Sequence, residues 1–188
     1  MRKVVAQTFL SLDGVMEAPE KWQLPNDLRG EDAGSYVFEA YSAAGALLLG
    51  RVTYEQFAAF WPNQSDDDPF AKRINELPRY VVTRTLKKLD WPGSRAIGSD
   101  VTAEVRKLKE ESSGDILIPG SSQLVNGLAK DGLIDEYRLL IHPIVVGKGK
   151  HLFEAGTMPT LFTVAETRTF CTGVVALVCW PRGKAVVS

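Results

Sequence analysis

Residues 46–55 read ALLLGRVTYE, and this stretch decides the fold. Ala46 to Leu49 are apolar at every position, as expected of a strand that helices cover on both faces. Gly50 interrupts the run, and apolar residues then recur with the spacing of one helical face: Tyr54, Phe57, Ala58 and Trp61. Thr53 and Gln56 fit a capping box that would begin this helix at Thr53. The stretch therefore predicts a buried strand, a tight turn and a helix, the repeating unit of an α/β protein.

The same alternation extends outward from this stretch. Strands are predicted at 3–10, 80–83, 94–97 and 116–118, and helical spacings occur around 36–44, 70–77, 100–108 and 124–129. The last third differs, because 137–146, 161–170 and 174–180 are β-type and no helical spacing separates them. We therefore predict one α/β domain over residues 1–188. Its mixed, mainly parallel sheet has helices on both faces and ends in a C-terminal antiparallel hairpin.

Composition limits the classes of partner. The chain has 188 residues, 45% of them hydrophobic, and its 22 Lys and Arg nearly balance its 23 Asp and Glu. A net charge of −1 provides no overall field for nucleic acid or an anionic membrane, so an anionic ligand needs a local site. No apolar run approaches the roughly 18 residues of a membrane span, and the N-terminus fits a strand better than a signal peptide. We expect a cytoplasmic protein in which Cys171 and Cys179 are buried thiols.

Two strand–helix junctions could hold phosphate groups. Residues 50–53 combine a glycine that permits close backbone approach, a helix start and the guanidinium of Arg51. Residues 119–122, PGSS, end a buried strand with Gly120 and two hydroxyls before another helix. The alternative is that these glycines are ordinary turn residues and the hydroxyls ordinary helix caps.

A third strand end adds a second arginine. Thr83-Arg84-Thr85 follows the strand at 80–83, and a positive charge there suits the 2′-phosphate of NADPH, although a plain surface arginine is an equal alternative. The motifs of common dinucleotide-binding dehydrogenases, nucleotide triphosphatases, zinc proteases and α/β hydrolases are absent. Two histidines are too few for a histidine-rich metal site, so no metal is expected. A hydrolase that pairs Ser121 or Ser122 with His142 or His151 stays open, since such groups assemble in space.

The motifs resemble those of the dihydrofolate reductase-like family. The segment Gly50-Arg51-x-Thr53-Tyr54-Glu55 is similar to the Gly-Arg-x-Thr-Trp/Tyr-Glu junction of dihydrofolate reductase. The closer resemblance is to the reductase domain of the bifunctional riboflavin-biosynthesis deaminase–reductase. It rests on segments in family order from about residue 3 to 180: 11–14 (SLDG), 48–55 (LLGRVTYE), 81–84 (VVTR), 132–136 (GLIDE), 142–143 (HP) and 147–153 (GKGKHLF). The zinc-deaminase motif of the other half of that enzyme does not occur in this sequence.

The resemblance implies an eight-stranded mixed sheet with NADPH across the strand ends and hydride transfer to a pteridine-like or ribosylaminopyrimidine-like heterocycle. By this resemblance Arg51 and Thr53 hold phosphates, and Thr83 and Arg84 flank the adenosine. It further places Gly120, Ser121 and Ser122 along the pyrophosphate or nicotinamide, and Asp13 and Trp22 at the substrate. A homodimer is expected on the same ground.

Reduction of a C=N bond also needs a proton donor, for which a carboxyl group in an apolar pocket is suited. The segment Trp22-Gln23-Leu24-Pro25-Asn26-Asp27 reproduces the pattern that precedes the proton-relaying carboxylate of dihydrofolate reductase and nominates Asp27. Asp27 stands further from Gly50 than in that enzyme, so Asp13, Glu31 and Asp32 are alternatives. Because the donor is open and Ser121 replaces a family glycine, a non-catalytic nucleotide- or pterin-binding protein is the second hypothesis.

Overall fold

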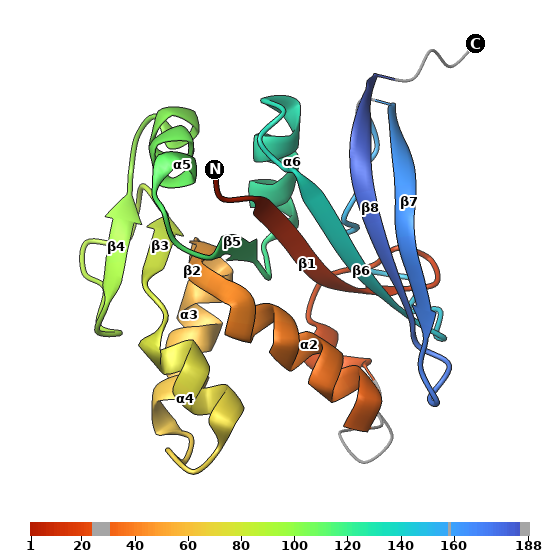
Figure 1. Cartoon of the computed structure of the whole chain (residues 1–188), viewed down its shortest axis with the longest axis horizontal. Coiled ribbons are helices and arrows are strands. Elements are labelled where there is room, and N and C mark those ends of the chain that lie inside the picture. Colours follow the sequence, from red (N-terminus) through yellow and green to blue (C-terminus); the bar gives the residue numbers. More distant parts are fainter. Residues whose placement is uncertain (24–30, 158, 185–188) are drawn as a thin grey trace.

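The computed structural model describes residues 1–23, 31–157 and 159–184, which contain one sheet of eight strands in the order β4-β3-β2-β5-β1-β6-β8-β7 (Figure 1). The strands are β1 (Val4–Ser11), β2 (Ala44–Gly50), β3 (Arg79–Val82), β4 (Ser94–Ile97), β5 (Asp115–Ile118), β6 (Glu136–His142), β7 (Thr160–Thr169) and β8 (Val175–Lys184). The α-helices are α2 (Glu31–Ala43), α3 (Arg51–Phe60), α4 (Pro69–Glu76), α5 (Val101–Glu110) and α6 (Ser122–Lys130), with short 3-10 turns η1 (Pro19–Lys21) and η2 (Trp61–Asn63).

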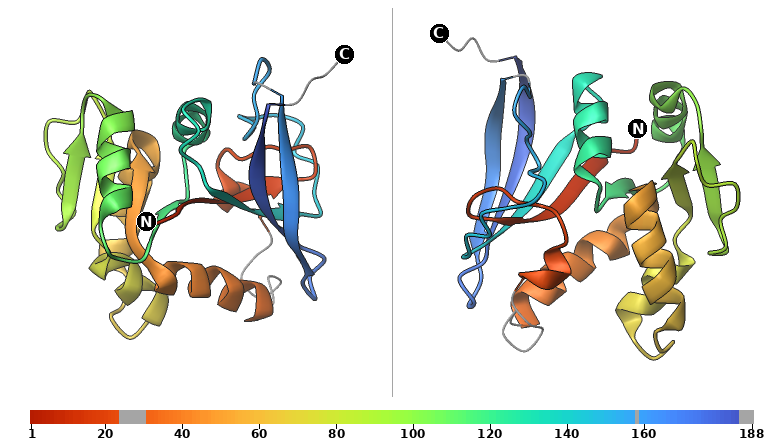
Figure 2. Two further views of the ribbon diagram at one scale, coloured as in Figure 1. Left: turned by 45° about the horizontal axis from the view of Figure 1, so that its top comes forward. Right: turned by 180° about the vertical axis from the view of Figure 1, so that it is seen from behind.

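Strand direction confirms the predicted architecture. The pairs from β4 to β6 are all parallel, whereas β8 runs antiparallel to both β6 and β7. Helices α2, α3 and α4 cover one face of the sheet, and α5 and α6 cover the other (Figure 2). The C-terminal strands thus form the antiparallel hairpin that the sequence predicts, at one edge of a mainly parallel sheet.

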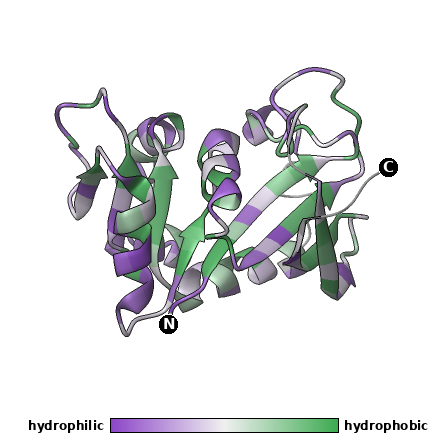
Figure 3. Cartoon of the chain, turned by 90° about the horizontal axis from the view of Figure 1, so that it is seen from above, coloured by the Kyte–Doolittle hydropathy of each residue, from purple (hydrophilic) through white to green (hydrophobic). Residues whose placement is uncertain are grey.

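The central strand β2 shows why the stretch at residues 46–55 decides the fold. Leu47, Leu48 and Leu49 are fully buried, and their side chains alternate between two cores. Leu48 belongs to the core under α5 and α6, while Leu47 and Leu49 belong to the core under α3 and α4. Figure 3 shows the apolar strands in the interior and polar residues on the outer helix surfaces. An uninterrupted apolar run satisfies both cores at once, as a doubly covered strand requires.

Two local predictions are wrong. Helix α3 begins at Arg51 with Gly50 as its N-cap, so Thr53 lies in the first helical turn and forms no capping box. Cys179 is buried as expected, but Cys171 is exposed, because it occupies the turn between β7 and β8. Within the described ranges, no helix has the length and apolar character needed to cross a membrane.

Candidate cofactor-binding site

The two junctions singled out in the sequence lie side by side. Strands β2 and β5 are parallel neighbours, so their carboxyl ends reach the same edge of the sheet. The backbone N–H of Gly50 donates to the carbonyl oxygen of Gly120 over 3.1 Å. A Cβ atom on Gly50 would stand 2.7 Å from Oγ and 3.2 Å from the backbone nitrogen of Ser121, and one on Gly120 would stand 2.9 Å from Oγ1 of Thr53. A side chain is therefore disfavoured at both turns, at Gly50 by the hydroxyl and backbone of Ser121 and at Gly120 by the hydroxyl of Thr53. We call Gly50–Thr53 with Gly120–Ser122 the paired corner.

Both helices that leave the paired corner have uncapped N-termini. Gly50 precedes α3 and Ser121 precedes α6, and neither residue makes a side-chain capping hydrogen bond. The first N–H groups of a helix lack intrahelical partners, and the helix dipole adds positive potential there. Two such ends that converge on one point form a suitable cradle for a pyrophosphate group. The peptide bond between Gly120 and Ser121, within this cradle, is cis.

A cavity of about 370 Å³ opens beside the paired corner. Gly50, Arg51 and Ser121 line one side, and Val82 and Leu124 supply apolar surface. Its other lining residues, Val101, Thr102, Gln123 and Asp131 among them, were not predicted from the sequence. A signal for Val101 and Thr102 was present in the sequence, because the β4–α5 connection is another strand–helix junction beside β3 and opens toward the same edge of the sheet. The side chain of Thr102 donates to Asp131 and so joins α5 to the end of α6.

Arg51 is positioned at the mouth of the cavity but is already paired. Its Nη1 atom donates to both carboxylate oxygens of Glu55, at 2.8 and 3.0 Å, one helical turn later. Both side chains are nearly half exposed. An exposed pair of this kind contributes only about 0.3–0.5 kcal/mol, less than the roughly 1.5–3 kcal/mol of a hydrogen bond to a charged group. A bound phosphate can therefore compete with Glu55 for the guanidinium.

The third predicted strand end, that of β3, lies at the same edge of the sheet as the paired corner. β3 pairs with β2 so that Val82 lies opposite Gly50, which places Thr83 and Arg84 next to the paired corner. The hydroxyl of Thr83 is buried and accepts the N–H groups of Thr85 and Leu86, so it closes the turn after β3. Arg84 is exposed and forms no ion pair within the described part of the chain. Of the two, Arg84 is the side chain available to an external anion.

Asp13 serves as an anchor between two loops. It accepts hydrogen bonds from the Ser11 hydroxyl at 2.6 Å and from the N–H groups of Val146 and Gly147 at 3.1 and 2.7 Å. The bond from Ser11 and then the two backbone bonds lower the pKa of Asp13 to about 2. An ionised carboxylate with three donors is poorly suited to deliver a proton near neutrality, so the structure disfavours Asp13 as the acid.

Asp32 is also held by other groups. One carboxylate oxygen accepts the backbone N–H of Cys171 at 3.1 Å, and the other accepts the N–H of Ala33 and the Cys171 thiol. The bond from the Cys171 backbone is the main cause that lowers the pKa of Asp32. Asp32 thus fastens the start of α2 to the β7–β8 turn and is disfavoured as the acid. Asp27 and the side chain of Glu31 lie outside the described part of the structure.

Trp22 packs near the ends of β1 and β6. Its indole N–H donates to the carbonyl oxygen of Glu17 at 2.8 Å, and its ring meets His142 edge-on with centroids 5.6 Å apart. His142 is buried and also contacts Phe9 edge-on, as expected of a packed strand residue. Ser121 instead lies on the β5–α6 turn against Gly50, two strands away. This separation disfavours the hydrolase alternative with His142.

His151 belongs to a different loop from either serine. It pairs with Val15 through an isolated antiparallel bridge. Met16, the next residue along, reaches the paired corner: its methyl group lies 3.5 Å from the position of a Cβ atom on Gly120. The side chain that this region brings to the paired corner is therefore that of Met16, and the contacts of the corner do not include His151.

Comparisons with known proteins agree with this geometry. The family model described as the RibD C-terminal domain matches residues 2–176. The uncharacterized protein YyaP of Bacillus subtilis (strain 168) is 29% identical over 180 residues, which cover 94% of each chain. A putative riboflavin biosynthesis protein from Shewanella sp. PV-4 has a similar structure, with a TM-score of 0.76 and 18% identity over 96% of this chain and 99% of that one.

Two further solved structures share the fold. The diaminohydroxyphosphoribosylaminopyrimidine deaminase/5-amino-6-(5-phosphoribosylamino)uracil reductase of Thermotoga maritima gives a TM-score of 0.65 at 18% identity, over 96% of this chain and 56% of that one. Dihydrofolate reductase from Enterococcus faecalis, complexed with NADP(H), gives 0.62 at 15% identity over 96% of each chain. At these identities the likeness concerns the fold, and it confirms the predicted dihydrofolate reductase-like architecture.

Proposed function

Because the chain belongs to the RibD C-terminal domain family, we propose that it is a reductase that transfers hydride from NADPH to a small nitrogen heterocycle. The observation that carries the proposal is the paired corner, where two uncapped helix starts and two glycines meet beside the guanidinium of Arg51. The likeness to a dihydrofolate reductase complexed with NADP(H) supports the choice of cofactor. The nicotinamide of a bound NADPH would supply the hydride.

In this proposal the residues of the protein bind the cofactor and orient it. The N–H groups at the starts of α3 and α6 receive the pyrophosphate, with Arg51 and Thr53 as side-chain donors. Arg84 lies at the adjacent strand end, where its charge suits the 2′-phosphate that distinguishes NADPH from NADH. Met16 provides an apolar surface beside Gly120.

The proposed substrate is a ribosylaminopyrimidine-like or pteridine-like compound. Reduction of its C=N bond needs a proton on nitrogen as hydride reaches carbon. With Asp13 and Asp32 tied to backbone N–H groups, Asp27 and Glu31 remain as the acids nominated by the sequence. The substrate class follows the Thermotoga maritima reductase, whose name specifies 5-amino-6-(5-phosphoribosylamino)uracil.

The first experiment is a titration with NADPH. Arg51→Ala should weaken binding about ten- to a hundredfold, because the lost charged hydrogen bond is worth roughly 1.5–3 kcal/mol. Arg106→Ala is the matched control, since Arg106 is an exposed arginine of α5 that does not line the cavity. Unchanged affinity in Arg51→Ala would remove Arg51 from the proposed site, and absence of NADPH binding by the wild type would overturn the proposal.

The second candidate function is a non-catalytic nucleotide- or pterin-binding protein on the same fold. It is favoured by the hydrogen bonding of Asp13 and Asp32, both of which anchor loops. Loss of NADPH absorbance at 340 nm distinguishes the two functions, with ribosylaminopyrimidines, pterins and dihydrofolate offered in turn. Oxidation with any of them rejects the non-catalytic reading, and tight binding without oxidation supports it.

A further inference from the structure

The cavity beside the paired corner has two ends. Its volume of about 370 Å³ lies within the roughly 300–1,000 Å³ that is usual for small-molecule sites. Gly50, Arg51 and Ser121 line it at the paired corner, whereas Asp131 lines it just beyond the last residue of α6. Ser121 and Asp131 flank the whole of α6, and at 1.5 Å per residue they stand about 15 Å apart along its axis. The second end of the cavity therefore lies away from the proposed phosphate site.

Apolar side chains form the walls between these ends. Val82 comes from the end of β3, and Val101 comes from the first turn of α5. Leu124 and Leu128 come from α6 and are four residues apart, so they lie on the same face of that helix. Contact with such side chains removes the faces of a planar ring from water. The middle of the cavity is thus suited to an aromatic ring.

Gly127 leaves an open place in the wall formed by α6. It lies within this helix and lines the cavity. Outside its own stretch of helix, no described atom comes within 4 Å of a Cβ atom built on it. Glycine within a helix is less favourable than alanine, and no close packing partner accounts for it here. The missing side chain leaves room for a flat ring against the backbone of α6.

A carboxylate with a fixed orientation stands at the second end. The hydroxyl of Thr102, at the start of α5, donates to Oδ2 of Asp131 and joins the two helices across the cavity. Within the described residues, Oδ1 of Asp131 accepts no hydrogen bond and no cation forms an ion pair with this side chain. Asp131 can therefore accept a further hydrogen bond from a ligand in the cavity.

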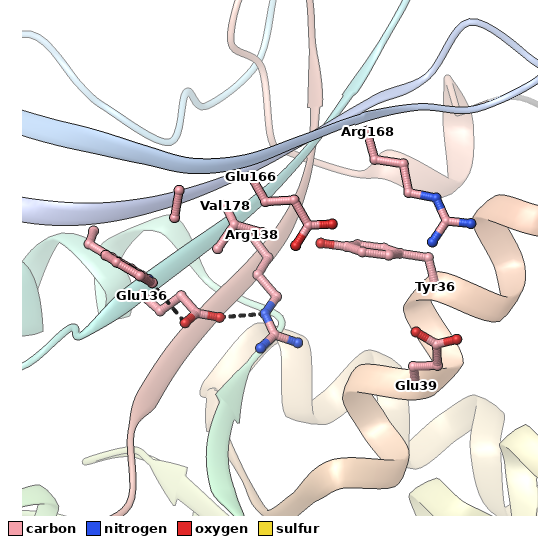
Figure 4. Close-up of a pocket in the computed structure, with 9 residues that line it drawn as sticks. Tyr36, Glu39, Glu136, Arg138, Glu166, Arg168 and Val178 are labelled. Carbon is pink, nitrogen blue, oxygen red and sulfur yellow. Dashed lines mark hydrogen bonds and ion pairs between the residues drawn. The ribbon is translucent and has the colours of Figure 1, made fainter.

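A groove near the other edge of the sheet differs in its chemistry. It has a volume of about 420 Å³ and lies beside β6, β8 and β7 (Figure 4). Charged side chains line it, among them Glu39, Arg138, Glu166 and Arg168. Arg138 is paired there with Glu136, which accepts its Nε–H at 2.6 Å. Of these two concave surfaces, the cavity beside the paired corner is the one with apolar walls for a ring.

The position of a base in this cavity depends on the proposed function. With the pyrophosphate at the paired corner and the 2′-phosphate at Arg84, the adenine of NADPH lies beyond its ribose, between α5 and α6. We propose that the adenine ring packs over Gly127 and that Asp131, oriented by Thr102, accepts a hydrogen bond from the 6-amino group. A carboxylate only accepts, so it favours this amino group over the 6-oxo group of hypoxanthine. Asp131 is thereby a specificity-determining residue for the base.

The hypoxanthine analogue of NADPH tests this selection by calorimetric titration. The wild type should bind NADPH about five- to tenfold more tightly than the analogue, the low end for a charged hydrogen bond because Asp131 is exposed. Asp131→Asn should bind both alike, because an amide can accept from an amino group or donate to an oxo group. Glu110→Gln removes a carboxylate of α5 that does not line the cavity, so it should keep the preference of the wild type.

Gly127→Ala tests the place of the ring separately. Alanine should raise the melting temperature, because it favours the helix, but weaken binding of adenosine 2′,5′-bisphosphate at least threefold, because its methyl group enters the cavity. Gly34→Ala in α2 is the control, which should raise the melting temperature without changing this affinity. A variant that is only misfolded would lose stability and affinity together.

Three results would each overturn the assignment of the base. They are equal binding of the two dinucleotides by the wild type, a preference that survives in Asp131→Asn, and unchanged binding of the bisphosphate by Gly127→Ala. In all three cases NADPH still binds, and the proposed function stands. Absence of NADPH binding by the wild type would overturn the proposed function and the assignment together.

Discussion

Strands β2 and β7 differ in how much of their faces and edges the rest of the chain covers. β2 has helices on both faces, parallel partners on both edges and a C-terminus that ends in the paired corner. β7 has one partner strand and is exposed along most of its length. β2 is completed by apolar packing and close backbone approach, whereas most residues of β7 stay exposed to water. Substitutions in β2 should therefore lower the stability of the fold strongly, and substitutions at exposed positions of β7 should lower it little.

The largest effect is expected at Leu48. Leu48→Ala removes a fully buried side chain from the core under α5 and α6 and should lower the free energy of unfolding by about 2–5 kcal/mol. Leu161→Ala on β7 removes the same atoms from a position that is 57% exposed and should change unfolding of the monomer by less than about 0.5 kcal/mol. Urea denaturation measures both. Equal losses in the two variants would contradict the contrast between the strands.

The next effect concerns the backbone contact of the paired corner. Gly50→Ala places a Cβ atom 2.7 Å from Oγ and 3.2 Å from the backbone nitrogen of Ser121. The two turns must separate, at a cost of about 1–3 kcal/mol in stability. We also expect more than a tenfold loss of NADPH affinity, because the converging helix starts move apart.

Gly34→Ala is the control for this glycine substitution. Gly34 lies in α2 with no atom within 4 Å of a built Cβ. Alanine there should stabilise the protein by about 0.5–1 kcal/mol through helix propensity. Thermal unfolding and NADPH titration of both variants provide the comparison. A Gly50→Ala protein that binds NADPH as the wild type does would show that close approach of the turns is not needed.

The contrast between the strands also explains what the sequence could predict. The uninterrupted apolar run at 46–49 allows one structure, a strand between two helical layers, so the central sheet and the paired corner follow from it. Predictions from local sequence patterns were wrong where contacts between distant residues determine the structure. Thr53 could have capped a helix, but the approach of Gly50 to Gly120 moves the helix start to Arg51. The state of Asp13 depends on N–H groups of Val146 and Gly147, more than 130 residues away, which no local pattern reveals.

Asp13, which lies outside both strands, gives a prediction about how stability depends on pH. Its pKa is about 2 in the folded protein against 3.8 in a model compound, so the ionised form stabilises the fold. This contribution is fully present above about pH 4 and is lost as the pH falls toward 2. Asp13→Asn should therefore melt below the wild type at pH 7, and the difference should narrow between pH 4 and 2. A difference that is constant over this range would show that the carboxylate charge is not the cause.

The smallest effect is expected at Glu55, and it tests how Arg51 serves the corner. Glu55 holds Arg51 through an exposed pair worth about 0.3–0.5 kcal/mol, which a bound phosphate must displace. Glu55→Gln removes this competitor and one negative charge, so NADPH affinity should rise about twofold while stability changes little. The gain should vanish in the Arg51→Ala background, because the competition needs both partners. Weaker binding in Glu55→Gln would mean instead that Glu55 orients Arg51 toward the ligand, and the ion pair would then be part of the binding geometry rather than a rival to it.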